Sequence, residues 1–130
     1  MTRELRFFVP VRFPSLNELI GAANRNHFDG GKLKKRFTRI AESYAREAAT
    51  RAKWTAPDGP VTIELAWVEP NRRRDQDNVT SGQKFLLDGL VGAGVIRDDS
   101  QQYVPQPSTN RISFDKDNPG VWVHVRRSEQ

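Results

Sequence analysis

An alternating stretch in the middle of the sequence constrains the fold most. In residues 61–68, Ile63, Leu65 and Trp67 fall on the same face of an extended chain, because side chains of a strand alternate between its two faces. Pro70 then stops the alternation, as proline does in a sheet. This pattern predicts a central β-strand, and it places the polar residues that follow just beyond the strand's carboxyl end.

Two helix-like stretches lie on either side of this strand. Residues 80–91 are predicted to form the shorter helix, beginning at Thr80, because Thr80 and Gln83 match a capping box. Residues 32–53 are predicted to form the longer one, since apolar side chains recur there at steps of three and four. The expected buried stripe of the longer helix comprises Leu33, Phe37, Ile40, Tyr44, Ala45, Ala48 and Ala52.

The remaining elements are predicted from short apolar runs and turn residues. Residues 5–11 indicate a first strand, and Ser15 or Asn17 could cap a short helical turn that ends at Ile20. A loop at 24–27 and a break at 29–31 follow. In the last third, the pattern predicts a short strand at 100–104 and a hairpin made of 111–114 and 121–125 around the turn 115–120.

These elements predict one α+β domain over residues 1–130, with a mixed β-sheet and two main helices. Lys and Arg number 21 against 16 Asp and Glu, which gives a net charge of +5 and a pI near 10.0, as in many proteins that bind polyanions. The absence of cysteine excludes disulfides, zinc–thiolate sites and thiol nucleophiles. No apolar run approaches the roughly 20 residues of a membrane span, so we expect a cytoplasmic protein without a membrane segment.

Three carboxylates suggest a metal site. Asp75 and Asp77 are two residues apart, so in an extended chain both side chains point the same way and can reach one cation. Asp99 follows the second helix, next to Asp98, and could supply a third oxygen. Carboxylate oxygens without histidine or cysteine suit Mg²⁺, with Mn²⁺ as a substitute, rather than zinc.

Positive side chains surround these carboxylates in the sequence. Lys84 could place its charge beside the transition state of a phosphoryl reaction. A second basic group lies at the start of the longer helix, where cations oppose the helix dipole, so helix stability does not explain it. Two explanations remain for these basic groups: they contact phosphates, or they are ordinary charged side chains on a solvated surface. The candidate phosphate-binding residues are Arg72, Arg73, Arg74, Lys34, Lys35 and Arg36.

The order of these residues resembles the RusA family of Holliday-junction resolvases. The resemblance rests on residues 71–101, and a weaker likeness covers residues 14–17. It implies a homodimeric, Mg²⁺-dependent endodeoxyribonuclease that nicks opposing strands of branched DNA, a four-way junction, without a small-molecule cofactor. By this resemblance Asp75, Asp77 and Asp99 fall on the metal-binding carboxylates, and Lys84 falls on the catalytic lysine. The spacing between Asn78 and Lys84 is longer than in the shortest family pattern.

Other functions stay open at this stage. The chain could hold branched DNA without cutting it, or it could be a metal nuclease that acts on flaps or single strands. A small phosphohydrolase for nucleotides is disfavoured, because the sequence lacks a glycine-rich phosphate loop and is rich in arginine. Each feature also has an ordinary structural explanation: the pair Asp75 and Asp77 could be a loop with solvated charges or a cap, and Lys84 with Asp88 could form a routine ion pair one helical turn apart.

Overall fold

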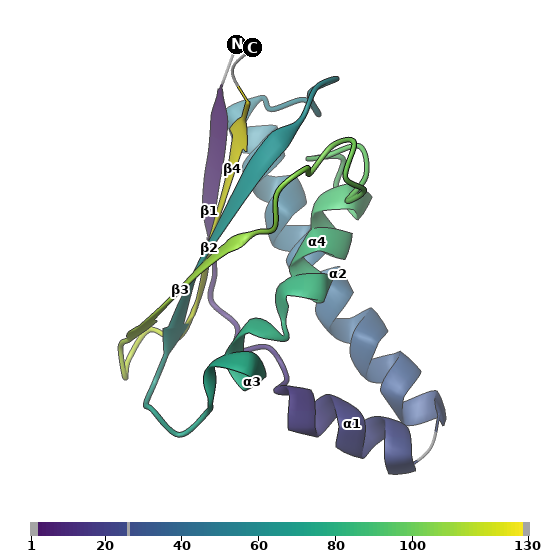
Figure 1. Ribbon diagram of the computed structural model, residues 1–130, viewed down its shortest axis with the longest axis vertical. Coiled ribbons are helices and arrows are strands. Elements are labelled where there is room, and N and C mark those ends of the chain that lie inside the picture. The colour runs from purple at the N-terminus through teal and green to yellow at the C-terminus, as the bar shows by residue number, and fades with distance from the viewer. Residues whose placement is uncertain (1–2, 26, 129–130) are drawn as a thin grey trace.

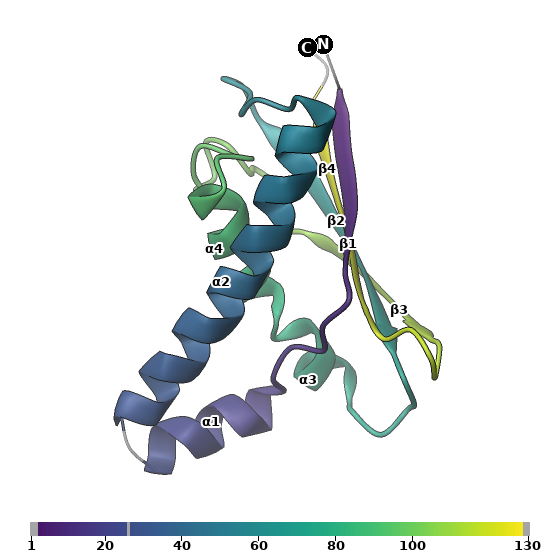
Figure 2. The same cartoon turned by 180° about the vertical axis from the view of Figure 1, so that it is seen from behind.

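The computed structural model describes residues 3–25 and 27–128, and within these ranges every helix lies on the same side of one four-stranded sheet (Figure 1 and Figure 2). β4 pairs antiparallel with both β1 and β2, whereas β2 and β3 run parallel. The sheet is therefore mixed, and the predicted α+β class is confirmed. In order across the sheet, the strands are β1 (Glu4–Val9), β4 (Gly120–Arg127), β2 (Val61–Glu69) and β3 (Thr109–Phe114).

β2 is the central strand that the alternating stretch predicts. It lies between β4 and β3, and its side chains alternate between buried and half-buried along its whole length. Ile63, Leu65 and Trp67 are buried on the side that carries the helices. The alternation continues one step past the predicted end, so that Glu69 is also buried. One covered face and one open face follow from this pattern.

The helices pack against the covered face of the sheet. α2 and α4 lie side by side in both views, and buried alanines of α2, Ala41, Ala45 and Ala49, let the two helices approach closely (Figure 1 and Figure 2). The two predicted main helices are thus present. No helix of the described residues is long and apolar enough to cross a membrane. The helices of the described ranges are α1 (Leu16–Arg25), α2 (His27–Ala52), α3 (Gln76–Thr80) and α4 (Gln83–Gly92).

The first part of the chain is more helical than its sequence suggests. Ser15 and Glu18 form a capping box: the Glu18 N–H donates to Ser15 Oγ at 3.1 Å, and the Ser15 N–H donates to Glu18 Oε1 at 3.4 Å. This box fixes the beginning of α1, and the helix continues to Arg25 instead of ending at Ile20. The loop predicted at 24–27 is wrong at both ends, because residues 24–25 belong to α1 and His27 begins α2, while residue 26 lies outside the described residues.

The break predicted at 29–31 is also wrong, since both glycines there lie inside α2. Gly30 explains why a glycine occurs within the helix. A Cβ at this position would lie 3.3 Å from the Cα of Ala23 in α1, so the bare backbone lets α1 and α2 pack closely. Tertiary packing outweighs the low helix propensity of glycine at this point.

The capping box predicted at Thr80 does not form. Thr80 is the last residue of α3, and its Oγ1 donates to the carbonyl of Gln76 at 3.1 Å. α4 begins at Gln83, with Gly82 as its N-cap residue and no side-chain cap. A Cβ on Gly82 would lie 2.9 Å from Cβ of Phe13 and 3.0 Å from the Trp67 ring, so packing requires glycine there. The residues between Asn78 and Lys84 thus form the end of α3 and the tightly packed glycine before α4.

The hairpin predicted near the carboxyl end is wrong in its pairing. β3 and β4 both form, but they lie on opposite sides of β2, so residues 115–120 pass across the end of that strand. The Asp115 N–H donates to the Glu69 carbonyl at 2.9 Å and fixes this crossing. The Asp117 N–H and the Asn118 amide donate to the Asp115 carboxylate and hold its pKa below the usual range. Residues 100–104 form turns and not the expected short strand.

Candidate functional site

Lys84 joins two segments that are distant in sequence. It lies in the first turn of α4, and its Nζ is 3.0 Å from Asp88 Oδ1, one turn further along the helix. The same Nζ is 3.0 Å from Oδ2 of Asp99, 15 residues away in the turns that follow α4. Two of the predicted catalytic side chains, Lys84 and Asp99, are therefore in direct contact.

The two carboxylates act together on the charge of the lysine. Hydrogen bonds to Asp88 first, and then to Asp99, raise the pKa of Lys84 above its ordinary value. Its ammonium group consequently stays protonated through the neutral range. The group is also accessible, since 69% of the Lys84 side chain is exposed, and it can meet a ligand without a change in the fold.

Asp75 and Asp77 lie at the start of α3, and both are exposed. Asp75 is the N-cap residue with extended backbone angles, and its carbonyl accepts from the N–H groups of Asn78 and Val79. Asp77 already has helical structure, and its Oδ1 accepts from the N–H of Asn78 at 3.1 Å. The expectation that both residues belong to one extended segment is therefore wrong, because the helix begins between them.

The three carboxylates have the chemistry of a magnesium site but are not assembled into one. Among the described residues, no group of three or more His, Cys, Asp or Glu side chains lies close enough together to hold a metal ion. Asp75 and Asp77 are joined by one short segment, whereas Asp99 shares its Oδ2 with the ammonium of Lys84. Their hard oxygen donors suit Mg²⁺. Binding would have to bring Asp99 and the aspartate pair together, and the metal remains a prediction.

The three consecutive arginines differ in what they contact. Arg74 is 17% exposed and donates to the Phe13 carbonyl at 2.8 Å and to Glu18 Oε1 at 2.6 Å. Its guanidinium therefore attaches this loop to the beginning of α1 and is engaged in internal contacts. Arg72 lies over the ring of Phe114 at 4.4 Å, and it is exposed. Arg73 is exposed too, and within the described ranges its guanidinium makes no ion pair.

The basic group at the start of the longer helix is exposed on the amino-terminal half of α2, beside α1 (Figure 2). Arg36 also lies over the ring of Phe37, with 5.6 Å from its Cζ to the ring centroid. This group forms a second basic surface, carried by a different helix from the one that holds Lys84. Its members are Lys34, Lys35 and Arg36.

Two supports of the site were not predicted from the sequence. The Asn17 N–H donates to Asn78 Oδ1 at 3.1 Å, which attaches α3 to the first turn of α1. Arg12 donates three hydrogen bonds to the buried Glu69 carboxylate, at 2.8 to 3.3 Å, directly before the acidic loop. The sequence does carry a sign of Glu69, because it occupies the next inward position of the alternating strand.

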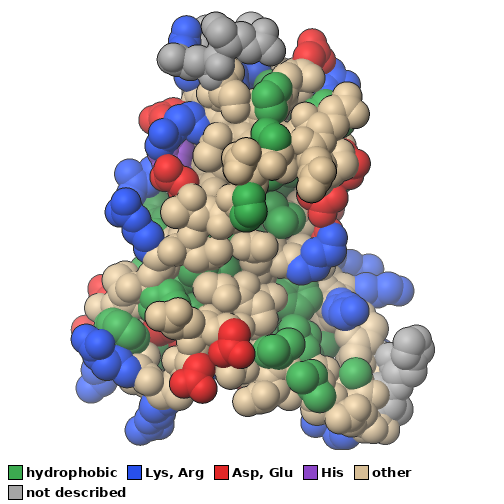
Figure 3. All heavy atoms as spheres, in the orientation of Figure 1, with side chains coloured by type: hydrophobic (Ala, Val, Ile, Leu, Met, Phe, Trp, Pro, Cys, Tyr) green, Lys and Arg blue, Asp and Glu red, His purple; other side chains and the backbone are tan. Residues whose placement is uncertain are grey.

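The charges of this region are mixed in sign. In Figure 3, acidic side chains lie over α3, and a group of acidic and basic side chains lies along α4.

No protein-family model matches this chain, and no curated protein matches it either. Two features therefore bear on function: the order of residues 71–101, and the contact between Lys84 and Asp99.

Proposed function

We propose that this chain is a Mg²⁺-dependent, structure-selective endodeoxyribonuclease that resolves Holliday junctions by paired symmetric nicks, as a homodimer in the cytoplasm. The observation that carries the proposal is the contact between Lys84 and Asp99 at 3.0 Å, which joins two side chains 15 residues apart. The choice of branched DNA as substrate rests on the resemblance of residues 71–101 to the RusA family.

Asp75, Asp77 and Asp99 would hold the metal. When bound, a divalent cation of this kind polarises the phosphodiester and lowers the pKa of a water molecule that attacks it. The ammonium group of Lys84 is held beside Asp99 and stays protonated, so it can stabilise negative charge that develops on a phosphate or leaving oxygen. Asp99 would be shared between the metal and Lys84, whose Nζ lies 3.0 Å from Asp99 Oδ2, so the lysine would stay next to the reacting phosphate.

The exposed arginines can position the DNA. Arg72 and Arg73 lie three and two residues before Asp75 and are accessible, so they can contact phosphates on either side of the cleaved bond. Such contacts orient a strand without reading its sequence, which is consistent with an enzyme that selects the shape of its substrate. Arg74 instead keeps the loop in place through Phe13 and Glu18.

The test uses the purified protein with a synthetic four-way junction and a linear duplex of the same sequence, each in Mg²⁺ and in EDTA. We expect paired nicks in the junction with Mg²⁺ only, and little cleavage of the duplex. Asp77→Asn should reduce cleavage by at least about 100-fold, because it removes a charged ligand from the metal, as loss of other catalytic groups does. Junction binding should stay within about twofold of the original protein.

Asp117→Asn is the matched control, since Asp117 is exposed in the turn between β3 and β4 and lies outside the proposed site. It should leave both cleavage and binding unchanged. Equal loss of binding and cleavage in the Asp77→Asn protein would mean that Asp77 maintains the fold. Absence of cleavage with Mg²⁺ and with Mn²⁺ would overturn the proposal.

A second candidate function is the binding of branched DNA without cleavage. The observation that favours it is that the described residues contain no assembled group of three metal-binding side chains. This candidate predicts junction binding without nicking under any metal condition. A nuclease for flaps or single strands would cleave those substrates at least as well as the four-way junction, so adding a flap and a single strand to the same assay distinguishes all three functions.

A further inference from the structure

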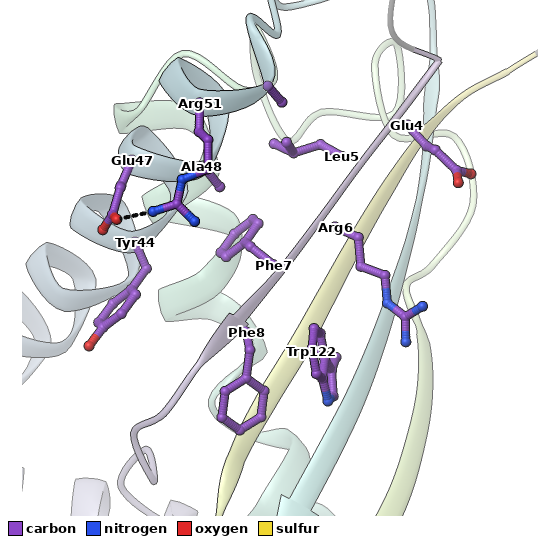
Figure 4. Close-up of a pocket in the computed structure, with 11 residues that line it drawn as sticks. Glu4, Leu5, Arg6, Phe7, Phe8, Tyr44, Glu47, Ala48, Arg51 and Trp122 are labelled. Carbon is purple, nitrogen blue, oxygen red and sulfur yellow. Dashed lines mark hydrogen bonds and ion pairs between the residues drawn. The ribbon is translucent and has the colours of Figure 1, made fainter.

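The open face of the sheet carries two neighbouring aromatic side chains. Trp122 of β4 is 39% exposed, and Phe8 of β1 packs beside it with 4.9 Å between the ring centroids. Figure 4 shows Leu5 and Phe7 directed toward α2, and Trp122 on the other side of β1. An exposed tryptophan contributes nothing to the core under the helices. Exposed aromatic surface of this kind commonly marks a binding site.

The aromatic pair belongs to a single row that crosses the whole sheet. Phe8 is paired with Trp122, Trp122 with Ala66 of β2, and Ala66 with Arg111 of β3. Because Ala66 is small, a hollow of about 240 Å³ remains between the Trp122 ring and Arg111. Adjacent strands lie about 4.8 Å apart, so a flat ring can stand in this hollow against Trp122 and bring a negative group to Arg111.

The charges around the row are not balanced. The two carboxylates of this face are engaged, since Glu4 lies 3.1 Å from His124, and Glu64 lies 3.4 Å from both His124 and Arg126. Arg6 and Arg111, by contrast, form no ion pair within the described part of the chain. The surplus positive charge is therefore located at Arg6, which lies over Trp122, and at Arg111, on the far side of the hollow.

Arg6 is also directed at the aromatic surface. Its Cζ lies over the Trp122 ring, 4.9 Å from the ring centroid, so the guanidinium covers part of the ring and also lines the hollow. A base that stacks on Trp122 would take the place of this guanidinium, which could then contact a phosphate of the same strand. Phe8 and Trp122 also line a groove of about 620 Å³ that follows the edge of β1 toward Tyr44 and Arg51 of α2 (Figure 4). An extended ligand could therefore continue from the open face to the edge of the sheet.

We infer that this face binds single-stranded nucleic acid. One base stacks on Trp122 beside Phe8, and phosphates of the strand contact Arg6 and Arg111. A nucleotide has a planar base that can stack on Trp122 and a phosphate that can pair with the arginines. Single-strand binding proteins combine aromatic platforms with basic side chains in this way. An apolar protein partner would instead leave both arginines without a counter-charge. The inference does not depend on the proposed nuclease activity and involves no metal.

The test measures the affinity for a fluorescently labelled thymidine 12-mer in EDTA, where no metal-dependent cleavage occurs. Trp122→Ala should weaken binding by about tenfold or more, because base stacking on a single aromatic side chain contributes on that scale. Trp122→Phe should restore part of the affinity. Arg111→Ala should weaken binding and lower the salt slope by about one unit. An abasic 12-mer should bind the original protein about as weakly as the thymidine 12-mer binds the Trp122→Ala protein.

Ile20→Ala is the control, because Ile20 is an exposed apolar side chain of α1 outside this face, and it should leave affinity unchanged. Circular dichroism checks that each variant is folded.

Equal affinity of the original and Trp122→Ala proteins, or equal affinity for the thymidine and abasic strands, would overturn the inference. A Trp122→Ala protein with unaltered strand affinity but a smaller mass in solution would show that this face joins two copies of the chain. Asp77→Asn should not alter strand binding, which separates this inference from the nuclease proposal.

Discussion

At the scale of single residues, Lys84 combines a small structural role with a large proposed chemical one. Its two ion pairs are exposed, and such pairs stabilise a protein by at most about 1 kcal/mol. The pairs explain a charged, positioned ammonium group, but they are not needed to hold α4, which is anchored by the buried Phe85, Leu86 and Leu90. A substitution at this position can therefore separate chemistry from stability.

We expect Lys84→Met to reduce junction cleavage by at least about 100-fold while it changes the free energy of unfolding by less than about 1 kcal/mol. Urea unfolding and the junction assay measure the two effects on the same preparation. The folded-state pKa of Lys84 is raised, so the stabilisation by its ion pairs is complete below its unfolded pKa and disappears as pH rises through the folded value. The part of the stability difference that comes from the ion pairs should thus vanish in strong alkali. A loss of several kcal/mol at neutral pH would contradict this account.

At the scale of elements, small residues determine how α2 and α4 meet. A Cβ on Gly89 would lie 2.8 Å from Cβ of Ala41 and 2.8 Å from the backbone nitrogen of Glu42. The backbone of a helix cannot move aside as a flexible side chain can, so this contact sets the separation of the two helices. α4 in turn carries Lys84, so the separation helps to fix where that residue lies relative to α2.

Gly89→Ala is consequently expected to destabilise the protein by about 1–3 kcal/mol, because the added methyl group overpacks the interface. The matched control is Gly31→Ala in α2, where an added Cβ has no neighbour within 4 Å. That control should stabilise the protein by about 0.5–1 kcal/mol through helix propensity. Thermal unfolding followed by circular dichroism measures both. If the two variants were equally stable, Gly89 would not be needed for α2 and α4 to approach each other.

The elements also show what a sequence can and cannot predict. Local periodicity was sufficient for β2 and for the main part of α2, since both depend on which side chains face the core. It failed at Gly30 and Gly82, where glycine is required by the close approach of Ala23 or of Phe13, contacts between segments that are distant along the chain. It failed again at 115–120, because turn residues reveal a reversal of direction but not that β2 lies between the two strands.

At the scale of the whole molecule, the candidate site depends on contacts over long sequence separations. The order of residues 71–101 selected Lys84 and Asp99 as site residues, and the structure brings these two side chains into contact. The internal role of Arg74 was not predictable, because its partners Phe13 and Glu18 are more than 50 residues away and no local pattern indicates them. The partner of a buried charge is equally hard to predict from sequence, because the two residues meet only in the folded protein.

The pair of Arg12 and Glu69 is another of these long-range connections, made by three hydrogen bonds. Glu69 ends β2 with 4% of its surface exposed, and Arg12 reaches it from the segment between β1 and α1. Arg12→Met would leave the buried carboxylate without its counter-charge, so we expect a loss of about 3 kcal/mol in the free energy of unfolding, near the lower end for buried pairs because Arg12 is partly exposed.

The double variant Arg12→Met with Glu69→Met should recover most of that loss, since two apolar side chains leave no buried charge behind. Urea unfolding of the single and double variants forms a cycle that isolates the pair. Single-strand affinity should not change in either variant, because the pair lies on the helix-covered side of the sheet and Trp122 lies on the open side. If the double variant were as unstable as Arg12→Met alone, the pair would not be the cause, and the connection between β2 and the start of α1 would have to be held by other contacts.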